Sequence, residues 1–189
     1  MTIWTFLPGE GALALTMMFL AFGLAAWANG LFFIGYGAEP AEGGAHPVKT
    51  VGVISFIAGL AGWATVIWVG FVVGGPGIAV MALATAYSLF FTALGLTAWL
   101  SLDLKPIANI CIVIALWSLP FIGFAGFDKD LLSQSSMVIW TIAFGLIWAV
   151  VYGKAKASWL GWWLLLTSVW TFLIPALRIA TGSTWLIMS

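Results

Sequence analysis

Charge is the scarcest property of this chain: its 189 residues include 6 Lys or Arg, 6 Asp or Glu, and 1 His. Because a soluble domain is about a quarter charged, a charged fraction of 6% excludes an ordinary water-soluble globule. The equal numbers of acidic and basic residues exclude a basic nucleic-acid-binding surface. Hydrophobic residues make up 63%, including 13 Trp, which excludes a disordered chain. The remaining class is an integral membrane protein.

Reactive side chains are equally scarce. The single cysteine, Cys111, lies within an apolar run, and we interpret it as a small buried hydrophobic residue. The single histidine, His46, is followed by Pro47 in a polar stretch, and we interpret it as a solvated loop residue. No His, Cys, Asp and Glu have the spacing of a metal site, and no nucleophile is paired with a base. We therefore expect no cofactor, no metal and no enzymatic activity.

Long apolar runs are abundant. A helix that spans a membrane needs about 20 mostly apolar residues. Such runs predict helices near residues 11–35, 51–74, 78–100, 106–126, 133–153 and 159–181. They are continuous and about twice as long as the alternating segments of a membrane β-barrel. The sequence therefore predicts one all-α integral membrane domain over residues 1–189, a bundle of six transmembrane helices.

The lysines predict the orientation of this bundle. Loops after the first, third and fifth predicted helices contain four of them: Lys49, Lys105, Lys154 and Lys156. Lys129 and Arg178 belong to the other side. Since basic loops stay in the cytoplasm, we expect both termini to face outward. No Lys or Arg precedes Lys49, so the first helix lacks the basic region of a secretory signal and is expected to be retained.

Charge is nearly missing from the predicted membrane core. The acidic residues fall in predicted loops or at helix ends: Glu10, Glu39, Glu42, Asp103, Asp128 and Asp130. Arg178 is the one charge inside an apolar pattern, and it lies close enough to a helix end to reach the membrane surface. Because intramembrane carboxylates mark proton relays and ion-coupled transport, their absence argues against a pump and favours a neutral permeant.

Aromatic and hydroxyl side chains recur at helical spacing. Trp140, Phe144 and Trp148 are spaced i, i+4, i+8 in the fifth predicted helix, with Thr141 beside them. The sixth and third helices offer a second group: Trp163, Thr167, Trp170, Thr171, Tyr87, Phe90 and Phe91. Helix packing or anchoring at the membrane interface is the alternative interpretation, which suits Trp4, Trp99, Trp159 and Trp185. A slot between flat rings with hydroxyl groups at its edges would accept a small planar polar molecule.

Other residues predict how the helices pack. Asn29, inside the first predicted helix, needs a hydrogen-bond partner, and we interpret it as a tie to another helix. Pro120 and Pro175 free the carbonyls of Leu116 and Thr171, and the Thr171 carbonyl could accept an N–H of a passing amide. A simple kink for packing is the alternative interpretation of both prolines. Close helix approaches are predicted at Gly23, Gly30, Gly59, Gly62 and Gly145.

Five short segments carry a resemblance over most of the chain. They are Asn29-Gly30, Phe56-Ile57-Ala58-Gly59-Leu60, Leu102-Asp103-Leu104-Lys105-Pro106, Gly145-Leu146-Ile147-Trp148 and Ile174-Pro175-Ala176. In this order and within a six-helix frame, they resemble the AmiS/UreI family of bacterial urea and short-chain amide channels. The resemblance implies a homohexamer in the bacterial inner membrane, with a pore through each six-helix protomer.

The resemblance also implies site residues. Trp148 matches a constriction Trp of the urea channel, and Phe144 falls where that channel has another Trp. Tyr87 or Phe91 would supply the aromatic residue of the third helix, and Phe22 would face the pore from the first. These expected pore residues join Trp140, Thr141, Trp163, Thr167 and Thr171.

Three departures favour an amide-type member over an acid-gated urea channel. The connection between the second and third helices shrinks to residues 74–77, where the acid-gated channel has a long titratable loop. Thr167 replaces a pore carboxylate, and His46 is predicted on the cytoplasmic side. We therefore expect a passive channel for urea and small amides that feeds a cytoplasmic amidase or urease. The alternatives are an accessory membrane subunit without a pore and a coupled secondary transporter.

Overall fold

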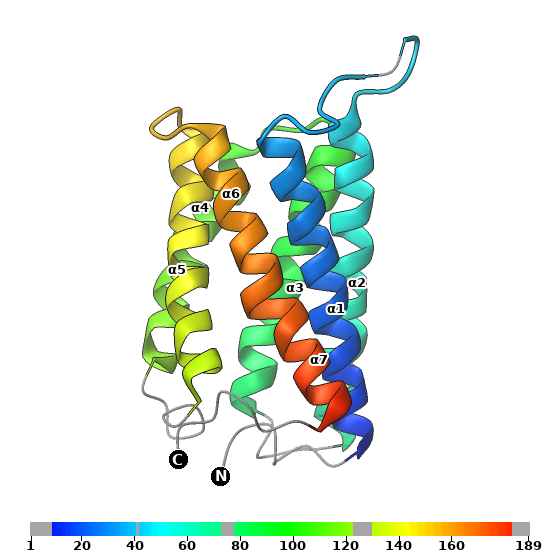
Figure 1. Cartoon of the computed structure of the whole chain (residues 1–189), viewed down its shortest axis with the longest axis vertical. Coiled ribbons are helices and arrows are strands. Elements are labelled where there is room, and N and C mark those ends of the chain that lie inside the picture. The colour runs from blue at the N-terminus through cyan, green and yellow to red at the C-terminus, as the bar shows by residue number, and fades with distance from the viewer. Residues whose placement is uncertain (1–8, 41, 73–77, 123–129, 183–189) are drawn as a thin grey trace.

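The structure, a computed structural model, describes residues 9–40, 42–72, 78–122 and 130–182. Its α-helices are α1 (Gly9–Phe33), α2 (Pro47–Val72), α3 (Ile78–Trp99), α4 (Lys105–Ser118), α5 (Leu131–Val151), α6 (Ala157–Thr167) and α7 (Ile174–Thr181). A 3₁₀ turn at Leu119–Phe121 extends α4, and a π-helical segment at Ser168–Leu173 joins α6 to α7. Within the described ranges the chain therefore forms six helical rods, which confirms the predicted all-α bundle (Figure 1).

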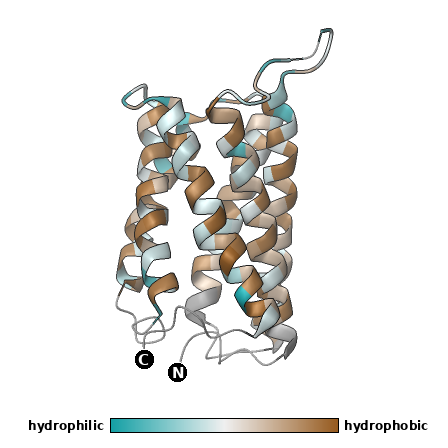
Figure 2. Ribbon diagram, in the orientation of Figure 1, coloured by the Kyte–Doolittle hydropathy of each residue, from teal (hydrophilic) through white to brown (hydrophobic). Residues whose placement is uncertain are grey.

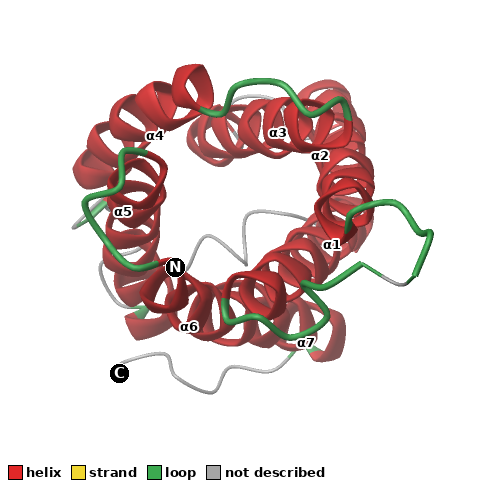
Figure 3. Cartoon of the chain, turned by 90° about the horizontal axis from the view of Figure 1, so that it is seen from above, coloured by secondary structure: helices red, strands yellow, loops and turns green. Residues whose placement is uncertain are grey.

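The rods stand side by side in a ring that follows the order of the chain (Figure 3). Each packs against its neighbours in sequence, and the rod formed by α6 and α7 closes the ring against α1. The pair α2 and α3 has the most extensive contact, whereas the contact between α3 and α4 is the sparsest between neighbours in the ring. The ring surrounds a common axis (Figure 3).

Five rods are long and apolar enough to cross a membrane: Ala12–Phe33, Pro47–Phe71, Met81–Trp99, Leu131–Val151 and Ala157–Thr181. The sixth, Lys105–Phe121, is shorter but also apolar. The ribbon in Figure 2 is brown or pale along most of the helices, with sparse teal. Large apolar side chains such as Phe71, 87% exposed, point outward. The chain is a multi-pass membrane protein.

Glycine accounts for the tight contact between α2 and α3. A Cβ placed on Gly95 of α3 would meet the backbone nitrogen of Phe56, and one on Gly59 of α2 would meet Thr92. Gly30 of α1 approaches the backbone of α6 in the same way, and added Cβ atoms on Gly23 and Gly62 would also meet neighbouring segments. Four predicted close approaches are thereby confirmed, at Gly23, Gly30, Gly59 and Gly62. Gly145 is different, since nothing lies within 4 Å of its Cβ position. The prediction that Gly145 brings two helices of this chain together is therefore wrong.

Helix four ends earlier than predicted. The sequence indicated a helix to residue 126, but Ile122 is already extended, with ψ of 121°. Pro120 has no N–H to continue the helix, and the carbonyl of Leu116 accepts the Leu119 N–H instead. Several expectations lie outside the described residues: Trp4, Trp185, Asp128, Lys129 and the connection at residues 74–77.

Candidate functional site

Three cavities follow one another along the axis of the ring. The largest, about 420 Å³, lies at the end where α3 and α5 finish and is lined by Phe33, Leu94, Val151 and others. We call it the vestibule, and we call this end of the bundle the lysine end because Lys49, Lys105, Lys154 and Lys156 belong to it. A central cavity has about 30 Å³, and one toward the opposite end has about 40 Å³.

Shared lining residues show that the cavities adjoin. Phe90, Phe91 and Leu164 line both the vestibule and the central cavity. Tyr87, Trp140 and Phe172 line both the central cavity and the cavity toward the opposite end. The cavities therefore form one row, narrowed where these rings stand between them.

The rings that narrow the row form one aromatic cluster, consisting of Phe22, Tyr87, Phe90, Phe91, Trp140, Phe144 and Phe172. Phe22 and Phe91 stack with centroids 4.6 Å apart and planes at 17°. Tyr87 stacks on Phe144 at 5.4 Å and 10°. Trp140 lies against Phe172 at 5.4 Å and 27°. All of these side chains are less than 10% exposed, so the cluster is a packed constriction built from α1, α3, α5 and the π-helical segment.

Hydroxyl and indole groups border this cluster. Trp140 Nε1 donates to Thr171 Oγ1 over 2.6 Å, and that hydroxyl donates in turn to the Thr167 carbonyl over 2.7 Å. The Tyr87 hydroxyl is 2.8 Å from Ser118 Oγ. Thr167 lines the central cavity and Thr171 lines the neighbouring one. The aromatic surfaces therefore have neutral polar groups at their edges, all of which already have partners inside the bundle.

The structure brings most of the sequence-predicted site residues together. These residues line the central cavity or its neighbours: Phe22, Tyr87, Phe91, Trp140, Phe144, Thr167 and Thr171. The ambiguity between Tyr87 and Phe91 disappears, because these residues are one turn apart on α3 and both face the axis.

Trp148 does not share this face. Its ring lies 5.3 Å from that of Tyr152 and 4.3 Å from the Lys154 ammonium, and it lines none of the three axial cavities. At 100° per residue, two steps of four residues rotate Trp148 about 80° away from Trp140, whereas Ile147 remains within about 20°. Ile147 accordingly lines the central cavity. The expectation that Trp140, Phe144 and Trp148 line one face is therefore wrong for Trp148, which does not face the axis.

Thr141 and Trp163 also lie away from the cavities. Thr141 Oγ1 donates to the Met137 carbonyl at 2.8 Å and lies 3.5 Å from the Ala115 carbonyl of α4. Trp163 Nε1 donates to the Ile139 carbonyl of α5 over 3.0 Å. Both side chains therefore join neighbouring rods instead of facing the axis, contrary to the sequence-based expectation.

Phe172 is the central residue that the sequence pattern missed. Its ring lies against Phe19, Phe22, Phe91 and Trp140, with centroid separations from 5.4 to 6.5 Å. It belongs to the π-helical segment, where the wider turn shifts the register that a regular α-helix would have. Pro175, which follows this segment after Ile174, was the available signal, because a proline without an N–H disturbs the preceding turn.

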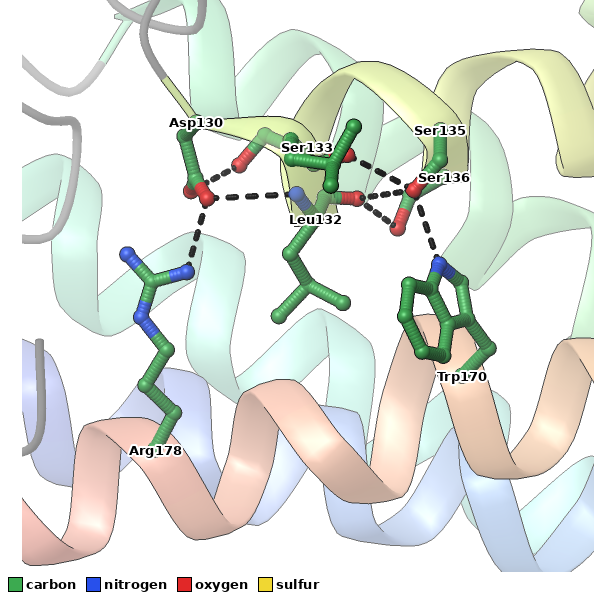
Figure 4. Close-up of polar contacts among 8 residues, drawn as sticks. Asp130, Leu132, Ser133, Ser135, Ser136, Trp170 and Arg178 are labelled. Carbon is green, nitrogen blue, oxygen red and sulfur yellow. Dashed lines mark hydrogen bonds and ion pairs between the residues drawn. The ribbon is translucent and has the colours of Figure 1, made fainter. Parts of the chain in front are cut away.

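A buried ion pair lies toward the end of the bundle opposite the vestibule. Arg178 Nη1 lies 2.7 Å from Asp130 Oδ1, and Ser133 Oγ donates to the other carboxylate oxygen over 2.6 Å (Figure 4). Asp130 also caps α5 by accepting the Leu132 N–H. The expectation that Arg178 reaches the membrane surface is wrong, because its side chain is 2% exposed. Asp130, expected in a loop or at a helix end, does lie at the end of a helix, and its side chain is 0% exposed.

Asn29 has the partner that its position predicted. Its Nδ2 donates to Ser55 Oγ of α2 over 2.8 Å, which confirms the interhelical tie. Cys111 is fully buried, as expected, and His46 is exposed in the loop after α1. Within the described parts of the chain, no three His, Cys, Asp or Glu residues are grouped as they would be around a metal ion.

These features define a class: a multi-pass membrane bundle with a row of axial cavities, narrowed by aromatic rings. Among known structures, the chain is similar to the Helicobacter pylori urea channel. Its closed-state cryo-EM structure has a TM-score of 0.72 and 13% identity, covering 88% of this chain and 97% of the channel. A crystal structure of that channel gives 0.67 and 15% identity, covering 90% and 99%. No protein-family model and no curated protein matches. The likeness shows that the two chains share a fold.

Proposed function

We propose that this protein is a passive channel for small neutral amides, urea included, which cross through the axis of each six-helix protomer. The row of cavities narrowed by the aromatic cluster carries this proposal. Of the described residues that line these cavities, two are charged, Asp103 and Lys105, and both belong to the vestibule. The pathway inside the bundle is therefore apolar with neutral polar edges, and no chemical step is required of it.

The aromatic cluster suits a planar amide on physical grounds. Stripping an amide group of its water costs about 2–7 kcal/mol when nothing replaces the lost hydrogen bonds. Flat rings such as Tyr87 and Phe144, stacked at 5.4 Å, can separate slightly to hold a planar solute between their faces. Thr167 and Thr171 can exchange an internal hydrogen bond for one to the solute. An ion would lose far more hydration energy and meet no compensating charge in the constriction.

The fold supports the same proposal, since both similar structures are those of a urea channel. Among the described residues that line the three axial cavities, Asp103 at the lysine end is the one carboxylate, and none is a histidine. His46 is exposed, and its Nδ1 accepts the Val48 N–H at the base of α2. We therefore propose amides as well as urea as permeants and a pathway that acid does not gate.

Orientation and assembly belong to the proposal as well. The lysine end would face the cytoplasm of a bacterial cell, since basic loops remain inside, and we propose that both termini then lie outside. The vestibule then opens toward a cytoplasmic amidase or urease. The apolar outer surface would meet lipid and neighbouring protomers in a homohexamer.

Swelling of proteoliposomes tests the function directly. Vesicles containing the protein should swell faster than empty vesicles in an inward gradient of urea or acetamide, at external pH 5 and pH 7 alike. Swelling no faster than in empty vesicles would reject the channel and favour an accessory subunit. Uptake that depends on an imposed proton or sodium gradient would instead indicate a coupled transporter.

A further inference from the structure

Asn29 presents an unused hydrogen-bond acceptor at the vestibule. Its side chain is 8% exposed and forms part of the vestibule wall. Its Nδ2 donates to the Ala25 carbonyl and to Ser55 Oγ, each over 2.8 Å. Since a backbone carbonyl only accepts, the atom facing Ala25 must be the nitrogen, which fixes the orientation of the amide. Among the described residues no hydrogen bond reaches Asn29 Oδ1, and protein atoms do not enclose that oxygen.

The position of Asn29 places this acceptor beside the aromatic constriction. Phe22, Ala26 and Asn29 share one face of α1, at spacing i, i+4, i+7. Ala26 lines both the central cavity and the vestibule. Asn29 follows Ala26 by three residues, a rise of about 4.5 Å toward the lysine end. The acceptor therefore lies where the vestibule meets the aromatic cluster.

The rest of the vestibule wall offers few polar groups. Among the residues that line it, only Asn29, Asp103 and Lys105 have polar side chains. Asp103 and Lys105 lie at the start of α4, where Asp103 Oδ1 accepts the Lys105 N–H in an exposed turn. Of these three described polar residues, Asn29 alone lies well inside a membrane-spanning helix.

We propose that Asn29 Oδ1 binds an N–H group of the permeant at the boundary between vestibule and aromatic cluster, so that the pathway selects primary amides and ureas over tertiary amides. This inference rests on the proposed channel function. The oxygen is neutral and only accepts, so a solute must supply an N–H or O–H to use it. A solute entering the constriction loses water from its N–H groups, and Asn29 replaces one of those lost hydrogen bonds. A tertiary amide cannot form this bond.

Ser55 lies beside this site without contributing to it. Its Oγ accepts a hydrogen of Asn29 Nδ2, while the hydrogen bond to the Ala25 carbonyl is by itself enough to fix the direction of the amide oxygen. Ser55 is 1% exposed and is not part of the vestibule wall. It therefore provides a matched control, because removing its hydroxyl breaks the tie between α1 and α2 while the acceptor remains.

Three isomeric amides test the inference on the unmodified protein. Propionamide, N-methylacetamide and N,N-dimethylformamide share one composition and one carbonyl oxygen, but they carry two, one and no N–H groups. After subtraction of the rate through empty vesicles, we expect permeability to fall in that order, with about a tenfold difference between the extremes. Equal protein-dependent rates for the three would overturn the role of Asn29. If no amide or urea passes faster than through empty vesicles, the channel function itself fails.

Two variants then assign the preference to Asn29. Ser55→Ala should keep the preference for propionamide over N,N-dimethylformamide, since the Ala25 carbonyl still holds Nδ2. The double variant Asn29→Leu/Ser55→Ala replaces the whole tie by apolar groups and should lose the preference. A double variant that retains it, or a Ser55→Ala variant that already loses it, would contradict the inference. Size-exclusion elution of both variants checks assembly, and if the double variant fails to assemble, the isomer series on the unmodified protein decides.

Discussion

Arg178 of α7 and Asp130 at the start of α5 form an ion pair of 2.7 Å, with side chains 2% and 0% exposed. Ser133, which donates to the same carboxylate, also lines the axial cavity toward this end. The pair therefore holds together the two rods that border this end of the pathway. Its charges face each other and not the constriction, so the axis remains neutral although a carboxylate is buried in the bundle.

Breaking this pair by one substitution should destabilise the protein. Arg178→Met leaves the Asp130 carboxylate buried without its guanidinium partner, which costs about 3–5 kcal/mol in comparable cases. We expect a clearly lower temperature of unfolding in detergent, followed by tryptophan fluorescence. Lys49→Met, which removes an exposed charge, serves as the control. Adding Asp130→Asn should restore part of the loss, and an Arg178→Met protein as stable as the control would contradict a structural role for the pair.

Substitutions at Phe172 and Trp148 should distinguish a residue of the constriction from one that lies away from the axial cavities. Phe172→Ala removes a ring that touches Trp140 and Phe22, so the constriction should widen. We expect the permeability ratio of butyramide to acetamide to rise several-fold in proteoliposomes. Trp148→Ala should leave this ratio within about twofold of its original value, because that ring packs on Tyr152 and Lys154. If Trp148→Ala changed the ratio and Phe172→Ala did not, Trp148 and not Phe172 would belong to the constriction.

A glycine-to-alanine substitution should affect folding and stability much more in α3, at Gly95, than in α5, at Gly145. Gly95→Ala places a Cβ against the backbone of Phe56, so α2 and α3 would have to move apart. Gly145→Ala meets nothing within 4 Å inside the chain and improves helix propensity. We expect Gly95→Ala to lower the yield of folded protein and its unfolding temperature, and Gly145→Ala to retain both. Size-exclusion profiles in detergent are the measurement, and equal behaviour of the two variants would contradict the close packing at Gly95.

Apolar run length was sufficient to predict the fold. In lipid every backbone polar group must be bonded within its own segment, so six apolar runs of this length leave helices as the favoured solution. The short connections then make neighbouring helices antiparallel, and the ring follows the order of the chain. The sequence prediction placed the end of α4 too late because it rested on hydropathy. Ile122 is apolar, and an apolar residue prolongs an apolar run whether or not it belongs to the helix.

The site was only partly predictable because spacing by four residues is not the period of a helix. Counting in fours placed Trp148 beside Trp140, whereas the 3.6-residue period brings Ile147 to the axis. The π-helical segment shifted the register again and brought Phe172 to the centre. The partner of Arg178 was hidden for another reason. Asp130 lies 48 residues earlier, and only the closure of the bundle brings the two together.

Cysteine labelling along α5 should distinguish the axis from the outer surface. In a Cys111→Ala background, Ile147→Cys places a thiol on the wall of the vestibule, while Ile142→Cys places one on an outer face that is 40% exposed and apolar. We expect a membrane-impermeant aqueous maleimide added from the lysine end to label Ile147→Cys in proteoliposomes and to slow urea entry. Ile142→Cys should label poorly, because lipid surrounds it and thiolate formation is unfavourable there. Equal labelling of the two positions would mean that water reaches both faces alike, and the axial pathway would lose its support.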